Sequence, residues 1–312
     1  MATMKAVCLE HFGGPDALEI KDVERPEVGE GEVLVRVRAA SVNPVDYKIR
    51  SGKYPTVKED QLPKVLGRDI SGTIMSCGKG VVGLKTGDDV YAMLDRGQGG
   101  YAEYVVLSAD LCVPKPKKLD HTAAAAVPLA AITAWQGLFD HGELLAGQRV
   151  LIHGGAGGVG HFAIQFAKSR GATVVTTVSG RDKEFVRSLG ADQAIDYKTE
   201  KFEDVVRDVD LVLDLVAGDT QERSWKVLKD GGVMISTLAR PSESRAREHH
   251  ARATNYMAKP NPSELTEIGR LIDEGKVNPC VESTFPLQQA ADAQRHLEID
   301  HPHGKTVLQI TA

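Results

Sequence analysis

Residues 150–168 read VLIHGGAGGVGHFAIQFAK, and this stretch indicates the architecture of the chain. A short apolar run breaks into five glycines, and the residues after them have the apolar pattern of a helix. Gly155, Gly157 and Gly160 have the G-x-G-x-x-G spacing of a turn whose backbone can approach a pyrophosphate. The helix N-terminus then offers free N–H groups to the phosphates. We therefore predict that a dinucleotide binds at Gly155, Ala156, Gly157, Gly158, Val159 and Gly160.

Strand and helix patterns alternate through this half of the chain. Helical segments, among them residues 181–189 and 220–228, separate short apolar runs at the spacing of βαβ units, which predicts a parallel sheet. We assign residues 126–262 to this α/β, doubly wound domain of the Rossmann type. Its strands are expected at residues 150–153, 173–178, 193–196, 210–215 and 233–237.

The N-terminal part of the chain has a different pattern. Short alternating runs such as residues 33–39 are separated by glycine-rich turns, which predicts a small, mostly antiparallel β domain. Strand character returns at residues 306–310, and we expect these last strands to rejoin the first domain. That domain then comprises residues 1–125 and 263–312.

The composition is that of an ordinary globular protein. The chain has 312 residues and a formal net charge of −5, which argues against a broad nucleic-acid surface. No apolar run approaches the roughly 18 residues of a transmembrane helix, and no signal-peptide pattern is present at the N-terminus. The four cysteines are dispersed, which predicts free thiols in a reducing compartment. We therefore expect a cytoplasmic protein without nucleic-acid or membrane partners.

The choice of cofactor depends on the end of the second strand of the parallel sheet, where NAD sites of this kind place a carboxylate. No carboxylate is present there. Ser179, Arg181 and Lys183 instead offer hydroxyl and cationic groups that suit a 2′-phosphate, although Asp182 dilutes the positive charge. Arg181 and Lys183 also fit the exposed first turn of a helix, so the pattern favours NADP (NADPH) without excluding NAD. Tyr197 is expected to close the same pocket.

Motifs along almost the whole chain resemble one family. They are residues 41–48 (SVNPVDYK), 67–72 (GRDISG), 87–91 (GDDVY), 123–138, 154–160, 188–192 (SLGAD) and 304–308 (GKTVL). The chain is similar to the zinc-independent medium-chain dehydrogenases/reductases of the quinone oxidoreductase family, in particular to NADPH-dependent quinone reductases and alkenal/enone reductases. The resemblance implies a GroES-like, β-rich catalytic domain beside the Rossmann domain, and a homodimer.

The resemblance also bears on metal binding. Zinc-dependent relatives hold a catalytic zinc with a Cys and a His-Glu pair, where this chain has residues 43–46 (NPVD) and Arg68-Asp69. Because Arg68 cannot serve as a zinc ligand, we expect no metal, and we expect Asp69 to pair with Arg68 or a neighbour. Without a Lewis acid, the chemistry left is hydride transfer from NADPH to an acceptor activated by conjugation. Such an acceptor is a quinone or the C=C bond of an enone or enal.

Four residues are expected near the acceptor oxygen, where negative charge develops. They are Asn43, Tyr47, Lys48 and Tyr54. A lysine at the position of Lys48 resembles the alkenal/enone-reductase branch, in which it is associated with the cofactor ribose and the enolate. A surface lysine on a short helix is the alternative interpretation. Asp46 is expected either to orient Lys48 or to cap that helix.

Further residues are expected beside the cofactor. Thr133 matches a family position next to the nicotinamide, and Val216, Leu238 and Met257 lie near strand ends; core packing is the alternative for all four. Two other functions stay open. A zinc-dependent alcohol dehydrogenase is one, and a non-enzymatic NADPH-binding sensor or assembly protein is the other.

Overall fold

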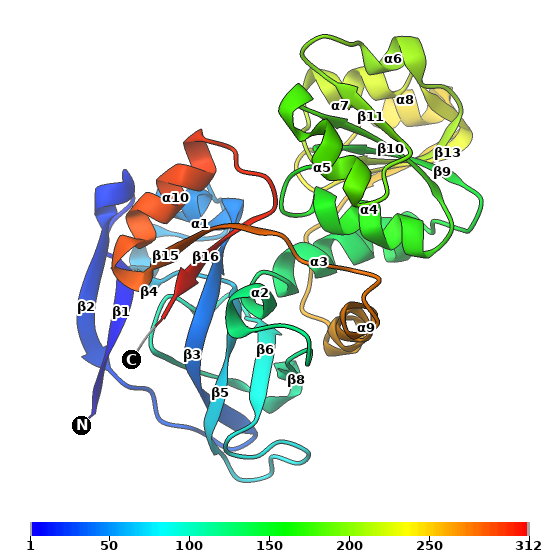
Figure 1. Ribbon diagram of the computed structural model, residues 1–312. Helices are drawn as coiled ribbons and strands as arrows, with labels where there is room; N and C mark the ends of the chain where they lie inside the picture. The colour runs from blue at the N-terminus through cyan, green and yellow to red at the C-terminus, as the bar shows by residue number, and fades with distance from the viewer. Residues whose placement is uncertain (1, 311–312) are drawn as a thin grey trace. The chain divides into compact units, whose positions relative to one another are not determined.

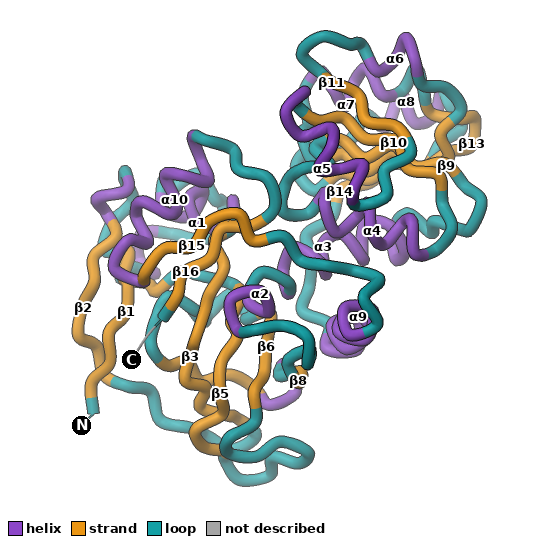
Figure 2. Tube along the Cα trace, in the orientation of Figure 1, coloured by secondary structure: helices purple, strands orange, loops and turns teal. Residues whose placement is uncertain are grey.

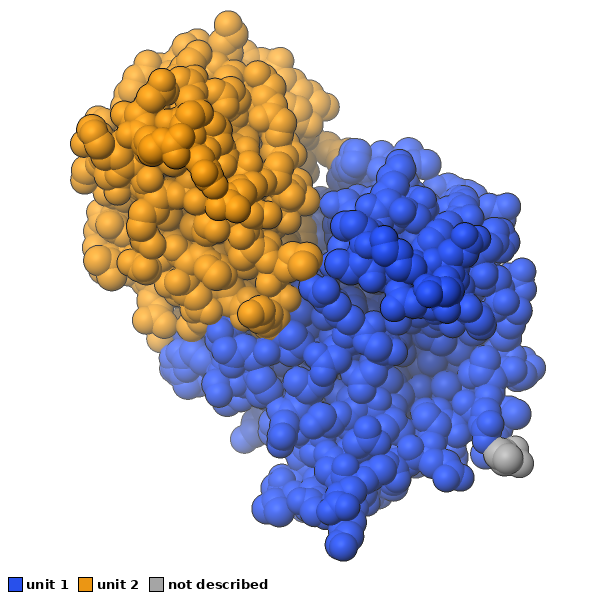
Figure 3. Space-filling view, turned by 180° about the vertical axis from the view of Figure 1, so that it is seen from behind, with its two compact units in different colours: residues 1–129, 260–274, 279–312 blue, residues 130–259, 275–278 orange. Residues whose placement is uncertain are grey.

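The computed structural model describes residues 2–310, which form two compact units (Figure 3). Unit 1 runs to Leu129 and includes Pro260–Glu274 and the residues from Pro279 onward, and unit 2 comprises Ala130–Lys259 and Gly275–Asn278. The domain boundaries expected from the sequence lie within four residues of 129 and 259. The return of the short segment 275–278 to unit 2 was not expected. No helix of the described residues is long and apolar enough to span a membrane.

Unit 1 contains two β-sheets in the described part of the chain. In the larger sheet the order is β15-β16-β3-β5-β6-β8, with β7 also paired to β3. In the smaller sheet the order is β2-β1-β4. The strands are β1 (Thr3–Leu9), β2 (Leu18–Glu24), β3 (Glu32–Val42), β4 (Lys64–Val65), β5 (Asp69–Cys77), β6 (Asp89–Met93), β7 (Tyr104–Ser108), β8 (Val113–Pro114), β15 (Val281–Pro286) and β16 (Lys305–Gln309).

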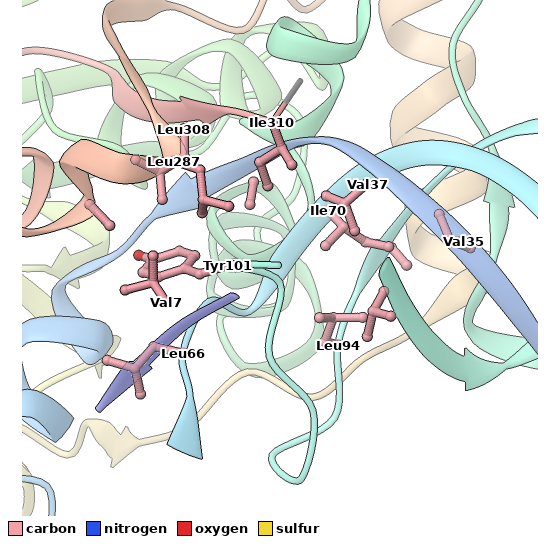
Figure 4. Packing of buried hydrophobic residues seen from close by; sticks show 14 of the residues in the cluster. Val7, Val35, Val37, Leu66, Ile70, Leu94, Tyr101, Leu287, Leu308 and Ile310 are labelled. Carbon is pink, nitrogen blue, oxygen red and sulfur yellow. The ribbon is translucent and has the colours of Figure 1, made fainter. Parts of the chain in front are cut away.

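The C-terminal strands complete this unit. β16 pairs antiparallel with β3, and β15 pairs parallel with β16 (Figure 1). The alternating residues of β3 place apolar side chains into one core with Leu66, Tyr101 and Leu308 (Figure 4). The expected β-rich domain built from both ends of the chain is therefore present.

Four α-helices lie entirely within the described residues of unit 1. They are α1 (Pro44–Arg50), α2 (His121–Ala125), α9 (Pro262–Asp273) and α10 (Ala290–Ile299). Helix α1 begins after Asn43, whose N–H donates to the Asp46 carboxylate at 2.8 Å, and Pro44 fits its first position. Asp46 therefore caps the helix, which is one of its two expected roles. The buried Arg50 guanidinium joins α1 to α10 through Gln294 at 2.9 Å and Glu298 at 2.7 Å.

Unit 2 contains a parallel sheet in the order β11-β10-β9-β12-β13-β14 among the described residues. This order is that of a doubly wound dinucleotide-binding sheet, and it confirms the predicted fold class. Helices separate the strands (Figure 2). The strands are β9 (Arg149–His153), β10 (Thr173–Val178), β11 (Gln193–Asp196), β12 (Val209–Asp214), β13 (Leu228–Ser236) and β14 (Arg252–Asn255).

The helices of this half of the chain are short apart from α4. They are α3 (Pro128–Trp135), α4 (Gly160–Ser169), α5 (Lys183–Ser188), α6 (Phe202–Val205), α7 (Asp219–Ser224) and α8 (Glu243–Glu248). The prediction of a helix to residue 228 was wrong in its end point. Helix α7 stops at Ser224 because Leu228 already begins β13, where it pairs with Val209.

Candidate cofactor and active site

The glycine-rich turn, residues 154–160, connects β9 to α4 and is packed too closely for larger residues at two positions. A Cβ on Gly155 would lie 2.0 Å from Thr176 Oγ1. A Cβ on Gly160 would lie 2.2 Å from the carbonyl oxygen of Gly154. Both distances are far below van der Waals contact, so these glycines hold strand and helix together, as the motif predicts.

Other parts of the turn are open to a ligand. A Cβ on Gly157 would meet only the Gly154 carbonyl oxygen, at an ordinary 3.5 Å. The N–H groups of Ala156, Gly158 and Val159 donate to no acceptor within residues 2–310. Free N–H groups at the start of a ten-residue helix form a cradle for a phosphate. The turn therefore fits the pyrophosphate of a dinucleotide.

Large apolar side chains are left exposed after four strands of the same sheet. Tyr197 follows β11, Val216 follows β12, Leu238 follows β13 and Met257 follows β14. The loop after β12 is held by Asp214, whose carboxylate accepts the N–H groups of Val216 at 3.0 Å and Ala217 at 2.8 Å. Exposed apolar side chains at the carboxyl edge of a parallel sheet are suited to cover a bound dinucleotide.

The residues expected at the 2′-phosphate lie together after β10 and β11. The Ser179 hydroxyl donates to Asp182 at 3.0 Å, and Lys183 forms an ion pair with Glu200 at 3.0 Å. Arg181 is exposed, with its Nε 3.6 Å from Asp182. The carboxylates of Asp182 and Glu200 therefore lie beside these cationic groups. A bound 2′-phosphate would have to replace these carboxylates as the partner of the cations or lie next to them.

Thr133 and two histidines lie deeper in unit 2. Thr133 is almost fully buried on α3, and its carbonyl oxygen accepts the Tyr256 hydroxyl. His153 is fully buried between the hydroxyls of Thr177 at 2.9 Å and Ser224 at 2.8 Å, and burial lowers its pKa to about 4. His161 is also buried, with Nδ1 3.1 Å from the Gly157 carbonyl oxygen.

In unit 1, Asn43 belongs to a buried polar network with Ser41, Asp69 and Lys305. Its amide nitrogen donates to Asp69 at 2.8 Å, and its amide oxygen accepts from the Lys305 ammonium at 2.5 Å. Asp69 also accepts from the Ser41 hydroxyl at 2.5 Å and lies 3.8 Å from Lys305. Of the two expected alternatives, Arg68 or a neighbour, the second is therefore the one observed, and the cation beside Asp69 is Lys305.

Sequence reasoning missed Lys305 in this network. The lysine belongs to the GKTVL motif at residues 304–308, but no pattern connected it to Asn43, 262 residues earlier. Burial lowers the pKa of Lys305, and the charge of Asp69 opposes that effect. The signal available was a lysine at the start of a short strand that contains Val307 and Leu308, where a buried charge is costly unless it has a partner.

Asp46 lies under α1 and is fully buried. Its oxygens accept the N–H of Asn43, the Tyr101 hydroxyl at 2.9 Å and the N–H of Gly67 at 3.2 Å. Burial raises its pKa to about 6 despite these donors. The carboxyl group therefore fixes α1 to the strand region below it.

A pocket of about 280 Å³ lies beside α1 within unit 1, and we call it the α1 pocket. Its lining includes Asp46, Ile49, Tyr54, Lys64, Arg68 and Arg96. Of the four residues expected near the acceptor, only Tyr54 lines this pocket. Tyr47 and Lys48 are half-buried elsewhere on α1, and burial together with Glu298 raises the pKa of Tyr47.

No group of three His, Cys, Asp or Glu side chains in the described part of the chain is arranged to hold a metal ion.

Two family descriptions match the chain. Residues 29–117 match the alcohol dehydrogenase GroES-like domain, and residues 189–308 match the family described as zinc-binding dehydrogenase. The chloroplastic NADPH-dependent alkenal/one oxidoreductase of Arabidopsis thaliana is 37% identical over 98% of this chain and 79% of that protein. The quinone oxidoreductase of Mus musculus is 32% identical over 97% of this chain and 96% of its own length.

A solved structure is equally similar. The quinone oxidoreductase from Coxiella burnetii is 38% identical, has a TM-score of 0.93 and is covered completely, with 99% of this chain matched. A Rossmann sheet with an intact dinucleotide turn and a GroES-like unit defines an oxidoreductase of the medium-chain dehydrogenase/reductase class. Within that class, the chain belongs to the zinc-independent quinone oxidoreductase family.

Proposed function

We propose that this protein is a reductase that transfers a hydride from NADPH to a quinone or to the C=C bond of an enone or enal. The observation that carries the proposal is the open cradle at Ala156, Gly158 and Val159, in a chain similar over its length to an NADPH-dependent alkenal/one oxidoreductase. The exposed apolar residues after the strands of unit 2 support cofactor binding.

NADPH would supply the hydride, and the protein would orient the acceptor and stabilise the negative charge on its oxygen. We assign the electrostatic role to Lys48, with the Tyr47 and Tyr54 hydroxyls as hydrogen-bond donors. We assign Asn43 a positioning role instead of a direct one, because its amide already bonds to Asp69 and Lys305. The carbon next to the carbonyl would take its proton from solvent.

The test of this function is an acceptor panel with product analysis. Purified protein should oxidise NADPH with quinones or with enones and enals, and the products separate C=C reduction from quinone reduction. Absence of turnover with every acceptor would leave an NADPH-binding protein without this activity. About one zinc per chain, with alcohol oxidation, would favour an alcohol dehydrogenase.

Lys48 gives a sharper test of the mechanism. Replacing Lys48 by Ala should lower kcat on enones about ten-fold or more, about 1.4 kcal/mol on the barrier, because the oxyanion loses a nearby positive charge. Lys53→Ala, an exposed lysine just after the helix, is the matched control. An unchanged kcat in a folded Lys48→Ala variant would remove Lys48 from the mechanism.

We further propose a cytoplasmic homodimer, formed through the last Rossmann strand near residues 255–258. Family resemblance supports the dimer, and the dispersed cysteines support a reducing compartment. Light scattering at several protein concentrations would test the dimer, and a mass of one chain throughout would contradict it.

A further inference from the structure

We propose that the α1 pocket binds an oxyanion, a carboxylate or phosphate group carried by the hydride acceptor, through Lys64 and Arg68. The assignment of the anion to the acceptor rests on the proposed reductase function. The anion site itself rests only on residues of unit 1.

Lys64 and Arg68 bring positive charge into this pocket without a carboxylate partner. Both residues are half-buried and line the pocket. The Lys64 ammonium donates to the carbonyl oxygen of Arg96 at 2.9 Å, and Arg68 Nε donates to the carbonyl oxygen of Leu94 at 2.9 Å. These bonds hold the two side chains in place, and neither side chain forms an ion pair with any acidic group in residues 2–310.

The two cations also act on each other. Burial lowers the pKa of Lys64, and the positive charge of Arg68 lowers it further. Two positive charges in one pocket repel each other, and this repulsion is unfavourable unless a negative charge binds between or beside them. A bound oxyanion would supply that charge, and the terminal nitrogens of Arg68 have the planar geometry that carboxylates and phosphates accept.

Asp46 lines the same pocket but does not neutralise the positive charge of Lys64 and Arg68. Its oxygens already accept hydrogen bonds from the Asn43 and Gly67 N–H groups and the Tyr101 hydroxyl. Its pKa is raised by burial, which is the opposite of what pairing with a cation would produce. The positive charge of Lys64 and Arg68 is therefore left for a ligand.

The rest of the lining indicates what kind of molecule carries the anion. Ile49 and Val57 supply apolar walls, and Tyr54 adds an aromatic ring with a hydroxyl. The volume of about 280 Å³ is at the lower limit for small-molecule pockets, so it suits one end of a small organic acid. Tyr54 is also one of the expected donors to the acceptor oxygen, which places the anion and the reacting group on one ligand.

The experiment compares an acid with its neutral ester. β-Acetylacrylate and para-carboxychalcone are enones of different length, and each is assayed beside its methyl ester. In Lys64→Gln and in Arg68→Gln, the ratio of kcat/KM for acid over ester should fall about ten-fold or more relative to wild type. Comparing ratios cancels the intrinsic reactivities of the acceptors, and ester turnover shows that the variant is folded.

Charge-conserving and distant substitutions provide the controls. Arg68→Lys and Lys64→Arg should retain most of the acid preference, and Lys79→Gln, which removes an exposed charge of unit 1, should leave the ratio unchanged. Acetate and inorganic phosphate, tested as inhibitors at equal ionic strength, show whether carboxylate or phosphate is preferred. Ratios within about two-fold of wild type in both glutamine variants would overturn the proposal.

A binding measurement separates this inference from the reductase function. Calorimetric titration with levulinate, the saturated form of β-acetylacrylate, should show binding that methyl levulinate lacks and that Arg68→Gln abolishes. If levulinate binds in this way but no acceptor is reduced, the anion site stands and the reductase function fails. If levulinate and its ester bind equally, or neither binds, the anion site is overturned.

Discussion

The two units bury polar groups beside their candidate sites in different ways. Unit 1 buries two carboxylates and an ammonium, since Asp46, Asp69 and Lys305 are all nearly inaccessible. Unit 2 buries His153 between two hydroxyls, and burial keeps that ring neutral at pH 7. The unit expected to stabilise charge buries a carboxylate beside an ammonium, Asp69 with Lys305. The unit expected to hold the cofactor also buries a carboxylate, Asp214, but surrounds it with neutral donors, and it adds close glycine packing.

Removing the ammonium from unit 1 tests this difference most severely. Lys305→Met leaves Asp69 and the Asn43 amide oxygen without their buried partner, so the free energy of unfolding of unit 1 should fall by about 3–5 kcal/mol. Urea unfolding combined with hydrogen exchange of β3 and β16 measures the loss. Lys79→Met is the exposed control; a loss below about 1 kcal/mol in Lys305→Met would show that the charge network is dispensable.

In unit 2 the corresponding test is a glycine-to-alanine substitution in the glycine-rich turn, which adds a single methyl group. Gly155→Ala should destabilise the unit by about 1–3 kcal/mol, because the added Cβ would overlap Thr176 Oγ1. Gly157→Ala should leave thermal stability nearly unchanged, because its Cβ would overlap no neighbouring atom. It should raise the KM for NADPH, because the Cβ would occupy space through which the backbone approaches the phosphates. Equal stability losses in both variants would contradict this division between packing and binding.

Acidification should affect the two units in opposite directions. Asp46 has a raised pKa, so its contribution to the stability of unit 1 grows as pH falls through about 6. His153 has a lowered pKa, so its contribution to the stability of unit 2 is lost as pH falls from the ordinary pKa of 6.5 to about 4. From pH 7 to 5 each effect is about 1–2 kcal/mol. Hydrogen exchange should show unit 2 losing protection relative to unit 1.

Matched variants isolate these two groups from the other titrations. Asp46→Asn should remove the relative gain in unit 1, and His153→Gln should reduce the relative loss in unit 2. Parallel pH profiles of wild type and both variants would contradict the assignment.

The smallest expected effect concerns cofactor choice. Arg181→Ala should raise the KM for NADPH about ten-fold more than that for NADH, because only NADPH carries the 2′-phosphate. Arg187→Ala, an exposed arginine on α5 that pairs with Glu184, is the control. Equal changes for both cofactors would show that Arg181 does not contact the phosphate.

The parts of the molecule that depend on local spacing were predictable from the sequence. The glycine-rich turn and the strand–helix alternation predicted the parallel sheet, because each signal lies within a few residues. The candidate site in unit 1 was less predictable. The Asn43 amide is bonded to Lys305, and a contact across 262 residues leaves no periodic pattern in the sequence. The placement of Asn43 near the acceptor oxygen stays a prediction.

The α1 pocket was also outside the reach of sequence reasoning. Arg68 was considered as an unsuitable metal ligand and as a partner for Asp69, and Lys64 was not singled out. Their common property, two cations without an acidic partner, depends on which carboxylates the fold brings near them. The spacing of residues along the sequence does not show whether a carboxylate will lie near Lys64 or Arg68 in the fold.

The hydrogen bond between Asn43 and Lys305 can form only after nearly the whole chain has been synthesised. All six strands of the parallel sheet leave the ribosome before Lys305 does, so unit 2 can form while unit 1 still lacks β15, β16 and α10. Until then, Asp69 has no ammonium beside it, and Arg50 has no α10 to bind. The nascent chain can therefore complete its cofactor-binding unit before its candidate catalytic unit.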